Sequence, residues 1–445
     1  MDIISQRILS ELGLATLARS PRDVTLLILQ RFVRFVAYGA STLILVSFLA
    51  ALGHSPARAG LFMTLTLVGD VLISLLLLLS ADRVLGRRAV PALGTALMAV
   101  SGVVFAAAPG SYWVLLVAAV VGVISSSGNE IGPFRAVEES IVAHLTLAAD
   151  RSDVTAIGVV VCGWGIEGLR RGLGWSLLDA YRGVFLGYAG LGLVKLVFAL
   201  ALSPAVEADE VNPSVSSRSE GAPTDTTPLL NPEPESTDSQ PETSQTRKTR
   251  WVTAALCFLF AVDSFASGLA PWSSVTYYFR SRFDLEEGRL GSVFFTTSII
   301  SAASVLVASS LTKRLGNVKT MVFTHLPSSV FLALIPIPSS LPLSLLFLIL
   351  RACAQSMDAT PRSAFLAAVL LPNERTAIMG AINVVKTAAQ SLGPFITGLL
   401  ADKGLFWVSV VCAGSLKASY DFGLLAIFKN YGRERQETRN DGEEQ

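Results

Sequence analysis

Long apolar runs recur along the whole chain and constrain its fold more than any other feature. Runs such as Val24–Leu52 and Leu61–Ser80 reach the length of about 20 residues that an α-helix needs to cross a hydrocarbon core of about 30 Å. Only 16% of the 445 residues are charged, whereas soluble domains are roughly 25% charged. Since a helix satisfies its own backbone hydrogen bonds in lipid, we expect an all-α, multi-pass membrane protein.

The apolar runs fall into two groups of six. Residues 204–250 separate the groups and are rich in Pro, Ser, Thr and Glu, so we expect a disordered linker there. The expected domains are a first bundle (1–203), this linker, a second bundle (251–429) and a tail (430–445). The expected spans are Val24–Leu52, Leu61–Ser80, Val90–Ala108, Tyr112–Glu130, a weak span at Thr155–Trp164, Gly183–Leu202, Trp251–Phe279, Leu290–Leu311, Val318–Ile337, Leu341–Met357, Ala377–Leu400 and Leu405–Phe428.

The fifth span is the weak one, because its apolar part is only about half as long as a crossing needs. We therefore expect a truncated span, with roughly ten or more residues missing. If the truncated segment does not cross the membrane, the chain has eleven full spans. If Ser152–Leu169 does cross as a short helix, Glu167 and Arg170 lie at its outer edge.

Basic residues in short loops predict the orientation, because Lys and Arg accumulate on the cytoplasmic side. The sequence indicates that both termini and the linker are cytoplasmic. Arg170 and Arg171 fall on the wrong side under this orientation. The residues that support the orientation are Arg83, Arg87, Arg88, Lys248, Arg250, Lys313, Arg314, Lys319, Lys429, Arg433 and Arg435.

The two halves of the chain repeat each other. The segment DRVLG at Asp82–Gly86 matches TKRLG at Thr312–Gly316, at the same point after the second span of each half. The acidic-basic pair Asp150-Arg151 likewise matches Glu374-Arg375 at the start of the fifth span of each half. Parallel six-helix repeats are typical of transporters that bind their substrate between the repeats, near the bilayer midplane.

These loops, together with the two sets of six spans, resemble the major facilitator superfamily. The stretches Met321–Ser329, Met357–Phe365 and Asn373–Pro394 are similar to an uncharacterised fungal and bacterial branch of it. The loop after span 2 departs from the usual motif, with Leu78 in place of a Gly and one extra residue before Gly86. The resemblance implies two six-helix bundles and secondary active transport of a small solute by alternating access, with proton coupling as the default.

The resemblance also implies a conformational gate at the cytoplasmic side. Asp82 would lie near the N-terminal end of span 11, where the partial positive charge of the helix favours a carboxylate. Arg87 and Arg88 would form ion pairs that break in the other state, although simple anchoring at the membrane edge is an equal alternative. The expected gate residues are Asp82, Arg83, Gly86, Arg87, Arg88, Glu374 and Arg375.

Ionisable side chains at bilayer depth are costly, so each is a candidate for substrate or proton binding. Arg31 and Arg34 share one face of span 1, and Asp70 of span 2 lies at a similar depth to Arg34. An Arg34–Asp70 pair is therefore expected, either as a static bridge or in a transport role. Glu130, at the end of span 4, either reaches the cavity or marks the interface.

Three ionisable residues of the second half are expected near mid-depth: Asp263, Arg351 and Lys386. Asp263 is the expected proton carrier, and a fixed salt bridge is the alternative. Arg351 is expected either to bind an anionic substrate group or to pair with Asp358 or Asp263. Lys417 and Asp421 are four residues apart on span 12 and are expected to pair with each other.

Other functional classes find little support in the sequence. His54, His144 and His325 form no metal-binding pattern, and HExxH, CxxC and phosphate-loop motifs are absent from the sequence. We therefore expect no enzyme, cofactor or metal. We expect a monomer whose partners are a small solute, protons and the lipid bilayer. The net charge of +1 gives no reason to expect a nucleic-acid partner. A non-transporting isoform or sensor, caused by the short fifth span, is the alternative function.

The linker contains one candidate sorting signal. The segment DTTPLL has an acidic residue, Asp225, followed by Leu229 and Leu230, which fits an acidic-dileucine pattern. An adaptor can reach such a signal in a disordered cytoplasmic segment. The expected location is the plasma membrane or the vacuolar membrane.

Overall fold

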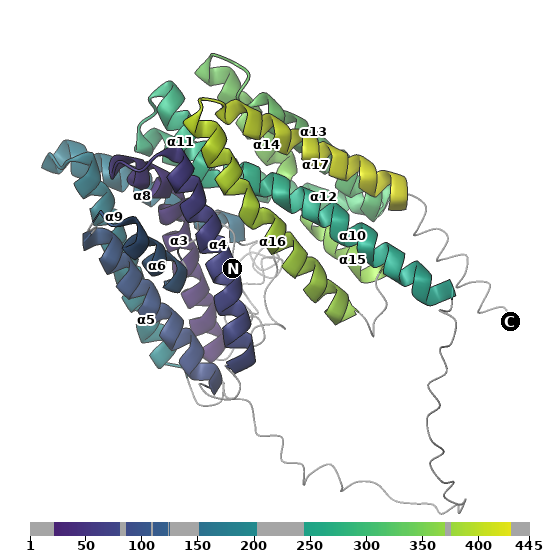
Figure 1. Ribbon diagram of the computed structural model, residues 1–445, viewed down its shortest axis with the longest axis horizontal. Helices are drawn as coiled ribbons and strands as arrows, with labels where there is room; N and C mark the ends of the chain where they lie inside the picture. Colours follow the sequence, from purple (N-terminus) through teal and green to yellow (C-terminus); the bar gives the residue numbers. More distant parts are fainter. Residues whose placement is uncertain are drawn as a thin grey trace, which may run out of the picture.

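The computed structural model describes residues 22–80, 86–107, 110–122, 124, 151–202, 244–369 and 375–428. Within these ranges the regular secondary structure is entirely helical. The helices form two bundles that lie side by side, and each bundle comes from one half of the sequence (Figure 1). The expected all-α fold with two helical bundles is confirmed.

The first bundle is built, in its described part, from long helices and one shorter helix, α6. The helix α9 ends toward the linker, so we call this end of the molecule the linker end and the opposite end the far end. Successive helices alternate in direction between the two ends. The bounds are α3 (Arg22–Ala51), α4 (Pro56–Ser80), α5 (Gly86–Ala107), α6 (Tyr112–Val121), α8 (Arg151–Leu173) and α9 (Leu177–Leu200).

The second bundle contains two spans that are each divided into two helices. Pro271 has no backbone N–H and separates the first two helices, because it cannot continue the hydrogen bonding of the helix before it. A turn at residues 356–358 divides the fourth span in the same way. The bounds are α10 (Ser244–Leu269), α11 (Trp272–Phe283), α12 (Glu287–Leu315), α13 (Asn317–Leu334), α14 (Leu341–Gln355), α15 (Ala359–Val369), α16 (Arg375–Asp402) and α17 (Phe406–Phe428).

Several helices differ in extent from the sequence-based expectation, and two of the differences bear on the site and the linker. The fifth span is one helix of 23 residues, α8, so it is longer than its apolar stretch and about 34 Å long at 1.5 Å per residue. It continues through the charged residues Glu167, Arg170 and Arg171, which the apolar pattern excluded. The helix α10 begins at Ser244, inside the stretch expected to be linker.

Five stretches within the described part of the chain are helical and both long and apolar enough to cross a membrane. The five stretches are Thr25–Ala51, Pro56–Ile73, Leu177–Leu200, Trp251–Phe283 and Phe406–Phe428.

The largest hydrophobic core joins the two bundles. It includes Phe48 and Phe62 of the first bundle together with Val275 and Leu290 of the second. A second core, built around Phe260 and Tyr420, lies within the second bundle alone. The halves are therefore held together by shared apolar packing as well as by polar contacts.

Among the described residues, the close contacts between the bundles lie toward the far end, where the two sets of helices converge in Figure 1. A Cβ atom placed on Gly60 of α4 would lie 2.3 Å from the carbonyl oxygen of Pro394 and 2.9 Å from the Cα atom of Gly398 in α16. The Thr64 hydroxyl accepts a hydrogen bond of 3.1 Å from the backbone N–H of Phe395 beside this crossing. The two helices can approach so closely only because both residues at the crossing are glycine.

Candidate functional site

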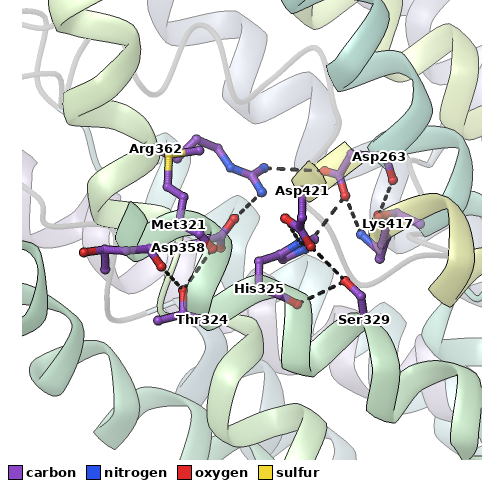
Figure 2. A network of polar contacts seen from close by, with 11 residues as sticks. Asp263, Met321, Thr324, His325, Ser329, Asp358, Arg362, Lys417 and Asp421 are labelled. Carbon is purple, nitrogen blue, oxygen red and sulfur yellow. Dashed lines mark hydrogen bonds and ion pairs between the residues drawn. The ribbon is translucent and has the colours of Figure 1, made fainter. Parts of the chain in front are cut away.

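A buried cluster of charged side chains lies inside the second bundle (Figure 2). Asp263 of α10 is at its centre and is only 5% exposed. The Lys417 Nζ atom, from α17, lies 2.6 Å from Asp263 Oδ1. The guanidinium of Arg362 in α15 lies 3.6 Å from Asp263 Oδ2. Two permanent cations from two other helices therefore neutralise this one carboxylate.

A second carboxylate, Asp421, is paired with a histidine and has no exposed surface. The Nδ1 atom of His325 in α13 lies 2.9 Å from Asp421 Oδ1 and 3.0 Å from Oδ2. The Ser329 hydroxyl, one turn further along α13, donates to Asp421 Oδ2 at 3.3 Å. The other ring nitrogen, Nε2, lies 3.9 Å from Asp263 Oδ1. The imidazole of His325 thus lies between the two carboxylates.

The remaining members of the cluster come from the divided fourth span and from α16. Asp358, in the turn before α15, pairs with Arg362 one helical turn later. The Arg362 guanidinium lies over the rings of Phe260 and Tyr420, at 5.6 Å and 5.9 Å from their centroids. The Lys386 Nζ atom lies 5.5 Å from the centroid of Phe260. The aromatic faces stabilise cations that lipid would otherwise disfavour.

Local backbone features bring these side chains together. A Cβ atom on Gly414 of α17 would lie 2.5 Å from the carbonyl oxygen of Ser329, so this glycine lets α17 approach α13 closely. The close approach brings Asp421 within hydrogen-bonding distance of His325. The turn at residues 356–358 has the same effect for Asp358, because it places a carboxylate inside the bundle.

The charges of this cluster balance when His325 is neutral. The three carboxylates of Asp263, Asp358 and Asp421 face the three permanent cations of Arg362, Lys386 and Lys417, which gives a net charge of zero. Buried charges are tolerated when they are paired in this way. Binding of one proton at His325 or Asp421 would change the net charge of the cluster from zero to +1.

A smaller polar group lies inside the first bundle. Arg34 of α3 and Asp70 of α4 are 5% and 2% exposed, and both interact electrostatically with the hydroxyl of Tyr188 in α9. Tyr38 belongs to the same group. The charges expected at similar depth on α3 and α4 therefore converge at Tyr188, while a direct Arg34–Asp70 bridge stays a prediction. The Arg31 guanidinium lies over the Phe35 ring, 5.8 Å from its centroid.

Arg351 of α14 lies apart from the cluster and is 7% exposed. Its guanidinium lies 4.9 Å from the centroid of the Trp272 ring, at the start of α11. Within the described part of the chain, the Arg351 terminal nitrogen Nη1 and the Gln355 side-chain oxygen have no hydrogen-bond partner. These two residues are four apart and share one face of α14. The arrangement places a buried cation and an acceptor on one helix face, each with an atom that makes no hydrogen bond to the described residues.

Comparison with known proteins adds the family to this geometry. The model of the Major Facilitator Superfamily matches residues 27–286 and 268–442. The chain belongs to this superfamily. It is 36% identical over 426 residues to an uncharacterised membrane protein of Saccharomyces cerevisiae, and the match covers 92% of this chain and 94% of the yeast protein.

Solved structures with the facilitator fold resemble the whole chain at low sequence identity. A peptide transporter, POT, in complex with sulfate has a TM-score of 0.66 at 15% identity, covering 93% of this chain and 95% of its own. The nucleoside transporter NupG has a TM-score of 0.64 at 15% identity, covering 92% and 100%. A D-xylose-proton symporter has a TM-score of 0.62 at 14% identity, covering 90% and 97%. The fold and the family together support an integral membrane transporter.

Several of the facilitator residues expected from the sequence converge, and others do not. Asp263 and Lys386, both expected near mid-depth, lie in the buried cluster. The expected Lys417–Asp421 pair is wrong, because Lys417 reaches across to Asp263 on α10 and Asp421 binds His325. The alternative partners of Arg351 are also wrong, because Asp358 and Asp263 pair with Arg362.

Sequence reasoning missed the two residues that connect the cluster. His325 enters the sequence-based expectations only as one of three histidines that form no metal-binding pattern, although it lies in the middle of an apolar span, where any ionisable group is a candidate. Arg362 follows the expected end of the fourth span, because the apolar pattern does not reveal that this span continues as α15. A lone histidine at bilayer depth was the signal available in the sequence.

The remaining expectations for this facilitator protein concern residues whose side chains the structure does not describe. The helix α5 begins at Gly86 and α16 begins at Arg375, so these two residues of the expected gate each lie at the start of a helix. The side chains of Arg87, Arg88 and Arg375 are not described, and the following residues lie outside the described ranges: Asp82, Arg83, Glu130, Asp225, Leu229, Leu230 and Glu374.

Proposed function

We propose that the protein is a proton-coupled secondary active transporter of a small solute, and that His325 and Asp421 form its proton-binding pair. The observation that carries the proposal is the buried charged cluster of the second bundle, which contains one histidine among carboxylates and permanent cations. A buried ionisable network inside a transporter bundle is typical of proton relays. Histidine is the side chain whose charge changes most readily near neutral pH.

The contacts favour His325–Asp421 over Asp263 as the place where the proton binds. Two permanent cations, at 2.6 Å and 3.6 Å, hold the Asp263 carboxylate in its charged form. Asp421 instead has a neutral hydroxyl and a titratable imidazole as its hydrogen-bond partners. A proton added at this pair therefore meets less opposition than one added at Asp263. We accordingly assign Asp263 the alternative role, that of a fixed ion-pair partner.

Proton binding at this pair would act on the helices that carry it. His325 belongs to α13, Asp421 to α17, and Asp263 to α10, and the imidazole lies between the two carboxylates. A charged imidazole attracts both carboxylates and competes with Lys417 for Asp263. The protonation state of the pair would thereby change how tightly α10, α13 and α17 are held together. A ligand or proton that favours one of two helix arrangements in this way can couple proton binding to a conformational change.

For the solute, the available groups favour an organic anion. The Arg351 guanidinium has an orphan nitrogen, stacks on Trp272 and lies near the acceptor Gln355. Guanidinium groups bind carboxylates and phosphates in a planar, bidentate manner.

The N-terminal segments of α5 and α16 would form the gate at the linker end, with Asp82 near Arg375. The linker and both termini are proposed to face the cytoplasm.

Purified protein in liposomes tests the coupling for many solutes in parallel. The liposomes contain the pH-sensitive dye pyranine, and a panel of carboxylates, phosphates, sugars, peptides and nucleosides is added outside. We expect at least one organic anion to cause proton movement with the wild type. His325→Gln should abolish solute-driven proton movement while retaining exchange of the same labelled solute. Exchange with no proton movement in the wild type would refute proton coupling, and no response to any solute would refute transport.

One observation favours a second candidate, a non-transporting protein of the same fold. The second half of α8 carries Glu167, Arg170 and Arg171, three charged residues in a helix that should cross the membrane. A bundle with a defective fifth span would retain the fold and lose the movement. The liposome experiment separates the candidates, because this protein would bind a solute without exchanging it across the membrane.

A further inference from the structure

A second group of ion pairs connects the two bundles at the far end. Glu287, the first residue of α12, is 4% exposed. Its carboxylate accepts a hydrogen bond of 2.8 Å from the Tyr181 hydroxyl of α9, and it lies 3.8 Å from the Arg170 guanidinium of α8. Both partners belong to the first bundle. Arg280, from its own bundle, lies 3.2 Å away and also donates to the Tyr181 hydroxyl. One buried carboxylate therefore ties α12 to two helices of the other half.

The neighbouring acid makes a parallel connection. The Arg171 guanidinium donates to Glu286 Oε1 across the interface at 2.6 Å, and it lies 2.8 Å from Glu167 on its own helix. Trp164 of α8 donates to the Ser292 hydroxyl of α12 at 2.8 Å. The hydrogen bond from Arg171 lowers the pKa of the Glu286 carboxyl, so this residue stays charged at neutral and mildly acidic pH.

The backbones of α8 and α12 are in direct contact beneath these pairs. A Cβ atom on Gly163 would lie 2.3 Å from the carbonyl oxygen of Glu287 and 3.3 Å from the Cα atom of Gly291. A Cβ atom on Gly288 would lie 2.0 Å from Glu167 Oε2. The side chains therefore reach their partners only while the two helices touch. Separation of the bundles at the far end would break all of these contacts between the halves.

The arrangement also accounts for an anomaly in the sequence. Under the expected orientation, Arg170 and Arg171 lie on the side of the membrane where basic residues are disfavoured, in the last turn of α8. Each of them faces an acid of the second bundle. Contacts between the two halves explain why these two arginines are present, whereas membrane insertion and the rule for basic residues do not.

We propose that Glu286 and Glu287, with Arg170, Arg171 and Tyr181, form a latch between the bundles that holds the far end closed. Release of this far-end latch is then required before the transporter can open toward the side opposite the linker. The inference rests on the proposed function only in assuming that the two halves separate during transport. The other charged or titratable groups close to the latch are Cys162, Glu167, Arg280 and Arg289.

A native cysteine reports on opening at the far end. The Cys162 side chain is buried on α8, next to Gly163, and its thiol donates to the carbonyl oxygen of Ala40 at 3.6 Å. A variant with Cys257, Cys353 and Cys412 replaced by alanine leaves Cys162 as the single thiol. Its labelling rate with a bulky maleimide, measured on purified protein in lipid nanodiscs, increases when α8 and α12 separate.

Two conservative changes in this background test the latch. Glu287→Gln removes the charge but keeps an acceptor for Tyr181, and Tyr181→Phe removes the donor but keeps the ring. We expect the labelling rate of Cys162 to rise about tenfold with Glu287→Gln, which corresponds to about 1.4 kcal/mol, and severalfold with Tyr181→Phe. The two changes together should raise it by less than the product of the single effects, because both remove the same contact.

The matched control is Asp179→Asn. Asp179 pairs with Arg182 at 3.2 Å at the same end of the molecule, but both residues lie on α9, so this pair does not connect the halves. We expect Asp179→Asn to change the labelling rate of Cys162 less than twofold. If Glu287→Gln does not yield folded protein, Arg171→Gln at the exposed edge of the latch is used instead. Unchanged labelling in these latch variants, or an equal increase in the control, would overturn the latch.

The readout needs neither a solute nor a proton gradient. An increase in Cys162 labelling without any solute transport would support the latch and refute the proposed function. Solute transport by the wild type, together with unchanged Cys162 labelling in the latch variants, would support the proposed function and refute the latch.

Discussion

Removal of Lys417 gives the sharpest test of the buried cluster. The Lys417→Met variant leaves a side chain of similar length that cannot neutralise Asp263. The nearest remaining cation is then Arg362 at 3.6 Å, which already neutralises Asp358. Loss of one partner from a buried ion pair costs about 3–5 kcal/mol. Because Arg362 offers partial compensation, we expect about 3 kcal/mol, near the lower end of this range.

A double-mutant cycle separates the pair from its surroundings. Asp263→Asn alone leaves Lys417 without its 2.6 Å partner, whereas Lys417→Met with Asp263→Asn removes both charges at once. We expect the double variant to be more stable than the sum of the two single effects predicts, by about 1–3 kcal/mol. Thermal unfolding in detergent, followed with a thiol-reactive dye that labels the free cysteines as they become exposed, measures all four proteins.

The control is the same cycle with Asp421→Asn in place of Asp263→Asn. Lys417 and Asp421 share a helix face, but Asp421 receives its hydrogen bonds from His325 and Ser329. The coupling between Lys417 and Asp421 should therefore stay below about 0.5 kcal/mol, the value typical of an i,i+4 pair. Equal coupling in the two cycles would refute the assignment of Lys417 to Asp263, and so would strict additivity in the first.

Two further outcomes follow from contacts described above. Gly60→Val adds a side chain where a single Cβ atom would already lie 2.3 Å from the Pro394 carbonyl oxygen. The substitution should therefore lower the free energy of unfolding by about 1–3 kcal/mol and raise the labelling rate of Cys162. If both quantities stay unchanged, the close crossing of α4 and α16 is refuted. Arg351→Leu should abolish uptake of anionic solutes in the liposome assay and leave thermal stability nearly unchanged, because the cation has no carboxylate partner among the described residues; retained uptake would remove Arg351 from the site.

The architecture could be predicted from the sequence because hydrophobicity acts locally. Nearly every expected span corresponds to a helix, and α3, α4 and α17 fall within a few residues of their expected positions. Asp263 and Lys386 could likewise be placed at a common depth, since the rise per residue fixes depth once the ends of a helix are known.

The partners inside the bundle could not be predicted, because they depend on how the helices rotate and where they break. The spacing of Lys417 and Asp421 suggested a local pair, yet both side chains point toward other helices, which spacing alone cannot reveal. Arg362 reaches the cluster because the turn at residues 356–358 allows the chain to continue as α15. The hydrophobicity of the sequence gives no sign of this turn. The latch residues on α8 resemble defects of a span in the sequence, and only the fold shows that α12 supplies their opposite charges.

The glycine contacts at the far end have a geometrical consequence for the whole molecule. One contact joins Gly60 of α4 to Gly398 of α16, and the other joins Gly163 of α8 to Gly291 of α12. At both points backbone meets backbone, because a glycine has no side chain to hold the helices apart. Opening at the far end therefore has to break the polar contacts beside these glycines, such as the Trp164–Ser292 and Thr64–Phe395 hydrogen bonds, and it requires no repacking of side chains at the two crossings themselves.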